Sequence, residues 1–134
     1  MILTDRCTFC KTEKETIRYL LWDCTYTETF WKRILDWITN NTSHLHAFNI
    51  TEQVVTFGVE DNVVTDRVLD LMMLMAKHYI FRCRCLKVTP NFVCFSREVK
   101  QRAVVEKHIW LIKDNLTMYF LLWSPYVPLI KDIL

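Results

Sequence analysis

The residues best suited to chemistry are three cysteines near the N-terminus, Cys7, Cys10 and Cys24. A C-x2-C turn directs two thiolates toward one ion at about 2.3 Å, as in structural zinc sites. The spacing C-x2-C-x8-Y-x4-C places Tyr19 where a histidine would complete a Cys3His set. A phenol has a pKa near 10 and is not a usual zinc ligand. The pattern therefore predicts a degenerate knuckle in which these cysteines bind zinc at low affinity or not at all.

Other donors for a fourth ligand lie further along the chain. His44 and His46 follow an expected helix of about 16 residues, which spans roughly 24 Å. The short loop after that helix returns at most about 20 Å, so these histidines are out of reach. Cys83, Cys85 and Cys94 can approach the cluster only through tertiary folding. The simplest alternative is that the N-terminal cysteines are three buried or free thiols.

Basic side chains recur on the two long helices expected in the second half of the chain. Three of them fall within about 80° on an ideal helix and three form a second, looser stripe: Lys77, Arg84 and Lys87, then Arg97, Lys100 and Lys107. Two such stripes on neighbouring helices can follow a phosphate backbone, so RNA or DNA is the expected partner. The alternative is a solvated helix face, because the net charge is only +2.

Motifs that carry catalysis are missing from the sequence. It contains no G-x-S-x-G, no Gly-rich phosphate loop and no H-E-x-x-H. Asp66 and Asp70 stand four residues apart, a spacing that is common on helix surfaces. Aromatic residues such as Tyr79 and Tyr119 are more typical of a core than of a base-stacking platform. We therefore expect a protein that is not an enzyme.

The elements that must position these residues are mainly helices. The 134 residues amount to one domain, and 1 Gly and 3 Pro leave little material for the turns of an all-β chain. Helices are predicted at about 15–24, at 25–41 with Thr27 as N-cap, at 64–87, and at 91–122 with Asn91 as N-cap. The chain breaks at Thr89–Pro90 because proline disfavours helix at the preceding residue.

The predicted organisation is a knuckle-like cysteine unit followed by packed long helices. It divides into 1–41 (cysteine unit and first helix), 42–62 (linker or extended segment) and 63–134 (long-helix pair and tail). A short strand or hairpin near 52–59 is left open, since that stretch has β-branched residues and the single glycine. The knuckle turn and its short helix are expected to persist through packing of Phe9, Ile17, Leu21 and Trp22.

An intracellular location is expected. The apolar start of the chain ends at once at Asp5 and Arg6, so no signal peptide is visible. The longest apolar stretch, Met118–Ile130, contains two prolines and is too short to cross a bilayer, so no membrane partner is expected. The clustered cysteines favour reduced thiols or metal ligands over disulfides. Nucleus and cytoplasm, and any protein partners, remain open.

The stretch "LTDRCTFCKTEKETIRYLLWDCTYTETFWKRILDWI" resembles the cysteine-rich C-terminal region of non-LTR (LINE-type) retrotransposon polyproteins. That family carries C-x-F-C, then E-T-I-x-H-L-x-W-x-C, then F-W, which match Cys7, Phe9, Cys10, Glu15, Thr16, Ile17, Leu20, Trp22, Cys24, Phe30 and Trp31. The family histidine falls on Tyr19. Further along, "LMMLMAKHYIFRCRCLKVTPNFVCF" is similar to the family segment A-K-Y-Y-I-Y-x-C-K, and "VVEKHI" to its tail.

The resemblance implies a tail region that binds element RNA or target DNA during target-primed reverse transcription. The chain itself has no room for a polymerase, so the expected function is nucleic-acid binding without polymerase activity. Two alternatives are a helical protein-interaction domain and a folded remnant without function. Basic stripes exposed together on one face would favour nucleic acid, whereas dispersed ones would favour protein interaction.

Overall fold

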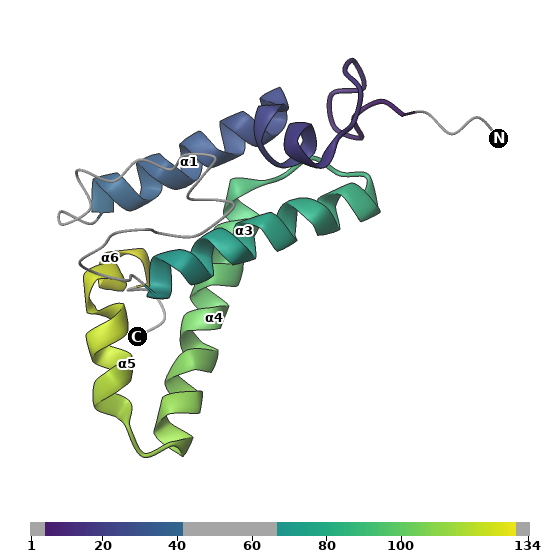
Figure 1. Ribbon diagram of the computed structural model, residues 1–134. Coiled ribbons are helices and arrows are strands. Elements are labelled where there is room, and N and C mark those ends of the chain that lie inside the picture. The colour runs from purple at the N-terminus through teal and green to yellow at the C-terminus, as the bar shows by residue number, and fades with distance from the viewer. Residues whose placement is uncertain (1–4, 42–66, 131–134) are drawn as a thin grey trace.

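The computed structural model describes residues 5–41 and 67–130, and these residues form packed helices (Figure 1). A π-helical turn at Tyr19–Asp23 leads into α1 (Thr25–Asn41). The second described range holds α3 (Arg67–Leu86), α4 (Phe92–Ile112), α5 (Leu116–Trp123), a 3-10 turn at Ser124–Tyr126, and α6 (Val127–Ile130). The predicted mainly α fold, with a cysteine unit ahead of packed helices, is confirmed. The strand considered near 52–59 lies outside the described residues, as does the whole of the predicted linker, 42–62.

Helix α1 (Thr25–Asn41) has the predicted bounds, but the N-cap predicted for it is wrong. It begins at Thr25, so Thr27 lies inside the helix and is not its N-cap. The buried Thr27 hydroxyl instead donates a hydrogen bond of 2.6 Å to the carbonyl of Leu20. This bond ties α1 to the π-helical turn that precedes it. The apolar face of α1 is turned into the core, where Phe30, Trp31, Ile34 and Ile38 are buried.

Helix α3 ends where its carbonyls find local partners. Lys87 adopts a left-handed conformation with φ 57°. Its amide donates to the Arg84 carbonyl, and the next amide, of Val88, donates to the Cys83 carbonyl. This pair of bonds is the Schellman arrangement that commonly ends helices. The predicted break before α4 is therefore confirmed, and Asn91 caps α4 as expected by accepting from the Cys94 amide at 3.2 Å.

The single long helix predicted for 91–122 is wrong, because it is divided into α4 and α5. Asp114 has φ 55°, and its amide donates to the Leu111 carbonyl while the Asn115 amide donates to that of Trp110. These bonds form a second Schellman motif, and Asp tolerates the left-handed region better than most residues. The chain therefore reverses, and Figure 1 shows α5 returning alongside α4.

The core lies where the helices meet, and aromatic side chains hold its centre. The Phe30 ring of α1 lies 5.5 Å from Tyr79 of α3 and 5.4 Å from Phe95 of α4, measured between ring centroids. Tyr79 and Tyr119 are both buried, as predicted for core residues. No helix in the described ranges combines the length and apolar character needed to span a lipid bilayer.

Candidate metal centre

The cysteine-bearing segment, residues 5–24 and here called the knuckle unit, begins with a tight reversal of the chain. Arg6 and Lys14 form an isolated antiparallel bridge, and the Cys7 amide donates to the Glu13 carbonyl at 2.8 Å. Lys11 turns the chain with φ 61°, and its amide donates to the Cys7 carbonyl. The reversal places the C-x2-C pair on one short loop.

The second half of the knuckle unit brings Cys24 to that loop. The Cys24 amide donates to the Tyr19 carbonyl at 2.8 Å, five residues earlier, which defines the π-helical turn. Residues five apart in an α-helix point about 140° away from each other. The wider turn reduces this difference, so the side chains of Tyr19 and Cys24 face the same loop.

The three predicted cysteines are brought together. The Sγ atoms of Cys7, Cys10 and Cys24 all lie within 4.8 Å of one another, and those of Cys7 and Cys24 are 3.7 Å apart. Cys7 and Cys24 are fully buried, whereas Cys10 is half-buried. Sulfur atoms grouped this closely, on a loop and a turn held by backbone hydrogen bonds, can hold a metal ion.

Tyr19 occupies the place where a fourth ligand was expected. Its hydroxyl lies 3.2 Å from the Cys10 sulfur. The hydrogen bond with Cys10, followed by burial, raises the pKa of Tyr19 well above its ordinary value. The phenol therefore keeps its proton near neutral pH and shares a hydrogen bond with the Cys10 sulfur. It acts as a hydrogen-bond partner of the cluster rather than as an anionic ligand.

The thiols differ in how readily they ionise. Burial by itself raises the pKa of Cys10, but hydrogen bonds from Thr12, Tyr19 and nearby backbone groups outweigh it and lower the pKa to about 6. At Cys24 burial dominates and raises the pKa to about 11. Cys10, which is more accessible than the buried Cys24, therefore ionises more readily than Cys24 does.

The other cysteines considered as donors do not join this group in the described parts of the chain. Cys83 is buried on α3, while Cys85 and Cys94 are exposed. His44 and His46 lie outside the described residues. Among the residues expected to hold the unit together, Phe9 is buried and Leu21 and Trp22 pack against the core. The prediction for Ile17 is wrong, because its side chain is 72% exposed.

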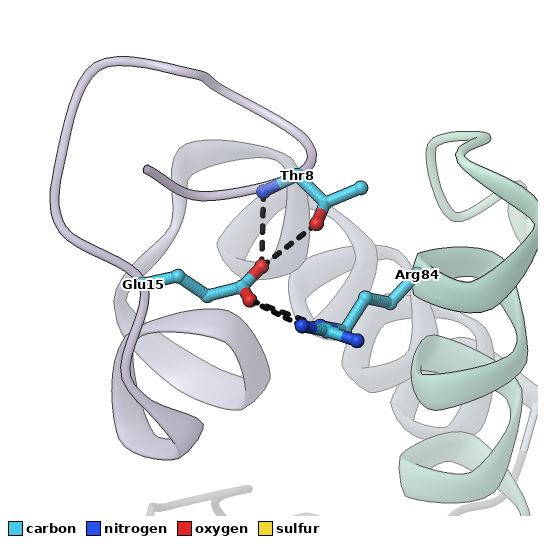
Figure 2. Close-up of polar contacts among 3 residues, drawn as sticks. All are labelled: Thr8, Glu15 and Arg84. Carbon is cyan, nitrogen blue, oxygen red and sulfur yellow. Dashed lines mark hydrogen bonds and ion pairs between the residues drawn. The ribbon is translucent and has the colours of Figure 1, made fainter. Parts of the chain in front are cut away.

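The knuckle unit is attached to α3 by a polar contact that the sequence did not indicate (Figure 2). One carboxylate oxygen of Glu15 accepts from the Thr8 amide and hydroxyl, at 3.0 and 2.8 Å. The other accepts from Nε and Nη2 of Arg84, at 2.9 and 2.8 Å. Burial favours the neutral acid, but Arg84 and Thr8 outweigh it and hold the pKa of Glu15 below its usual range.

Five of the six basic residues predicted to contact phosphate lie on α3 and α4, two helices that cross (Figure 1), and Lys87 lies in the turn just after α3. Lys87 and Arg97 are exposed, whereas Lys77, Lys100 and Lys107 are partly buried. Arg84 is engaged with Glu15, so a phosphate would have to displace that carboxylate. Two further arginines are paired with carboxylates, Arg82 with Glu98 and Arg102 with Glu106. Binding of the six to a nucleic acid stays a prediction.

Comparison of the chain with protein-family models, with curated proteins and with solved structures found no match. Its function must therefore be inferred from the residues themselves. Of these, the grouped thiols are the arrangement with the most specific chemistry. The Glu15–Arg84 contact is the feature that sequence reasoning missed, since each residue alone has many uses.

Proposed function

We propose that this chain is a non-enzymatic nucleic-acid-binding domain whose N-terminal unit is a zinc knuckle with Cys7, Cys10 and Cys24 as ligands. The observation that carries the proposal is the grouping of the three sulfurs within 4.8 Å. The resemblance of the same stretch to LINE-type retrotransposon tails supports it. Free thiols persist in reducing compartments, which agrees with the intracellular location that we propose.

Zinc suits this donor set better than other common ions. Thiolates are soft ligands that select zinc or copper(I), whereas magnesium and calcium prefer oxygen donors. A closed structural zinc site has four protein ligands, and the neutral Tyr19 phenol is a poor fourth. We therefore expect one zinc ion held by three cysteines, at an affinity below that of a complete four-ligand knuckle.

The metal proposal is tested by zinc titration of the reduced protein against a competing chelator. The expected result is one zinc per chain, which Cys24→Ser should abolish. The matched control is Cys94→Ser, since Cys94 is exposed on α4 and outside the sulfur cluster. Equal zinc binding by all three proteins would overturn the assignment of the ligands.

For nucleic acid, the residues in the best position are the five predicted cations other than Arg84. These are Lys77, Lys87, Arg97, Lys100 and Lys107. Each phosphate that they neutralise should contribute roughly −0.7 to the slope of log affinity against log salt for a single strand. A variant with Lys87, Arg97 and Lys107 changed to Ala should bind all RNA sequences more weakly and show a shallower slope. Unchanged affinity and slope would refute this contact surface.

An alternative function, a helical protein-interaction domain, has one observation in its favour. Large apolar side chains are exposed at the end of α4 and on α5: Leu111, Ile112, Phe120 and Leu121. Exposed apolar groups of this kind can mark protein contacts. Binding of RNA that ignores both salt and the basic residues would favour this alternative. Failure to bind any partner would favour a folded remnant without function.

A further inference from the structure

A cleft of about 370 Å³ lies where the knuckle unit meets α1. Its volume falls within the range of roughly 300–1,000 Å³ typical of small-molecule sites. The lining combines apolar walls with charged side chains: Trp22, Asp23, Glu28, Trp31, Lys32 and Leu35. The cysteine cluster does not contribute to this lining, so the cleft is a separate feature of the surface.

Two indole rings shape the cleft. The rings of Trp22 and Trp31 have centroids 6.0 Å apart and planes inclined at 45°. Trp31 is only 4% exposed, and its Nε1 donates to the Leu21 carbonyl at 2.8 Å, which fixes its orientation. Trp22 is partly exposed and packs against the core. A flat ligand can therefore stack against the Trp22 ring, because the neighbouring Trp31 ring is already held in place.

The charges at the cleft balance one another. Glu28 pairs with Lys32 at 3.0 Å, and Asp23 lies 3.7 Å from Arg18. The lining itself holds two carboxylates and one ammonium, and Arg18, which lies outside the lining, compensates the second carboxylate, so little net charge is left to attract a strongly cationic or anionic ligand. The two carboxylates supply hydrogen-bond acceptors and Lys32 supplies a donor, next to the two indole rings. A neutral, flat ring with polar edges matches this combination best.

We propose that this cleft binds an unpaired nucleobase and prefers guanine, an inference that builds on the nucleic-acid function proposed above. Unpaired bases in RNA complexes stack on aromatic side chains and are read along their Watson–Crick edges. Guanine presents two adjacent N–H donors, at N1 and N2, which suit a carboxylate of Asp23 or Glu28. Its O6 is an acceptor for the Lys32 ammonium. Adenine and uracil lack the paired donors.

The first test compares two eight-nucleotide RNAs, uridine throughout except for a central guanine or adenine, bound to the full chain at one salt concentration. The guanine RNA should bind about five-fold or more tightly, on the scale of one stacked and hydrogen-bonded base. Trp22→Leu should remove the preference, and Trp22→Phe should retain most of it because a flat ring remains. Trp37→Leu is the control, since Trp37 packs on Phe92 outside the cleft.

The carboxylates are tested by the double variant Asp23→Asn and Glu28→Gln. The readout is the ratio of the affinities for the guanine and the adenine RNA, because the removal of two negative charges will strengthen binding to any RNA. The ratio should fall toward one. A ratio unchanged in this variant and in Trp22→Leu would overturn the assignment of the base to this cleft.

A second measurement separates this inference from the proposed function. GMP, UMP and N-acetyltryptophanamide are titrated into the full chain, and the Trp22 indole N–H resonance is followed, identified as the signal lost in Trp22→Phe. GMP should move this resonance more than UMP does. If no RNA binds yet GMP moves it, the cleft stands and the wider function fails. RNA binding without any response of the resonance to GMP would overturn the cleft proposal. Binding of N-acetyltryptophanamide without a response to GMP would also overturn it, and would indicate that the cleft takes a protein side chain.

Discussion

Replacing Tyr19 by histidine should convert a three-ligand cluster into a Cys3His set. The phenol now lies 3.2 Å from the Cys10 sulfur, with its proton retained. An imidazole is shorter than a phenol, so it withdraws from that sulfur and leaves room for an ion between nitrogen and sulfur. The π-helical turn fixes the backbone at both Tyr19 and Cys24, so the new nitrogen should project into the same space.

The size of the effect follows from two contributions. Supplying a fourth protein ligand in place of water strengthens zinc binding, and a gain of only about 1.4 kcal/mol already corresponds to tenfold. In the metal-free wild type, the Tyr19–Cys10 hydrogen bond contributes about 0.5–1.5 kcal/mol, and it must be broken when zinc binds. The Tyr19→His variant has no such bond to break. Both contributions favour the bound state of Tyr19→His, so we expect zinc to bind at least ten-fold more tightly.

The assay is competition for zinc with a chromophoric chelator, using both proteins fully reduced. Tyr26→His is the matched control, because Tyr26 is an exposed residue of α1 two positions beyond Cys24. It adds the same side chain near the site without entering the cluster. Equal tightening in both variants, or a wild type that already binds as tightly as Tyr19→His, would refute this account of Tyr19 and require a fourth ligand from elsewhere.

Substitutions at three further positions test the fold, each by thermal or urea unfolding. Glu15→Gln should cost about 1–3 kcal/mol, because Arg84 loses a charged partner. The carboxyl has a depressed pKa, so its contribution is complete above about pH 4.3 and is lost as pH falls through the folded pKa; the Glu15→Gln variant should lack this acid dependence. Thr27→Val should cost about 1–3 kcal/mol by leaving the buried Leu20 carbonyl unpaired. Asp114→Gly should be neutral or stabilising, whereas Asp114→Val should destabilise the left-handed turn. Equal stability of the two Asp114 variants, an unchanged Thr27→Val, or a Glu15→Gln variant with the wild-type acid profile would each contradict the corresponding contact.

The sequence predicted the features of the fold that depend on neighbours along the chain. The apolar period gave α1 and the body of α3, and the Thr89–Pro90 break with Asn91 was correct because proline and asparagine act locally. The division between α4 and α5 was missed because apolar residues continue on both sides of Asp114. Only the two Schellman hydrogen bonds show that the chain reverses there.

At the candidate site, spacing was informative and long-range pairing was not. The convergence of three cysteines followed from a C-x2-C turn and a nearby helix, both short-range features. The role of Arg84 did not follow, because its partner Glu15 stands 69 positions away in the sequence. A basic residue on a helix surface suits a phosphate or a carboxylate equally well. Only the folded chain shows which of the two Arg84 contacts.

The contact between Glu15 and Arg84 also links the cysteine cluster to the helices. Glu15 accepts two hydrogen bonds from Thr8, which lies between Cys7 and Cys10, and two from Arg84 on α3. The Glu15 carboxylate therefore joins the loop that carries Cys7 and Cys10 to α3. Metal binding that orders this loop should stabilise its contact with α3, and loss of the contact should weaken the metal site. We therefore propose that Arg84 supports the knuckle unit through Glu15, independently of any contact with phosphate.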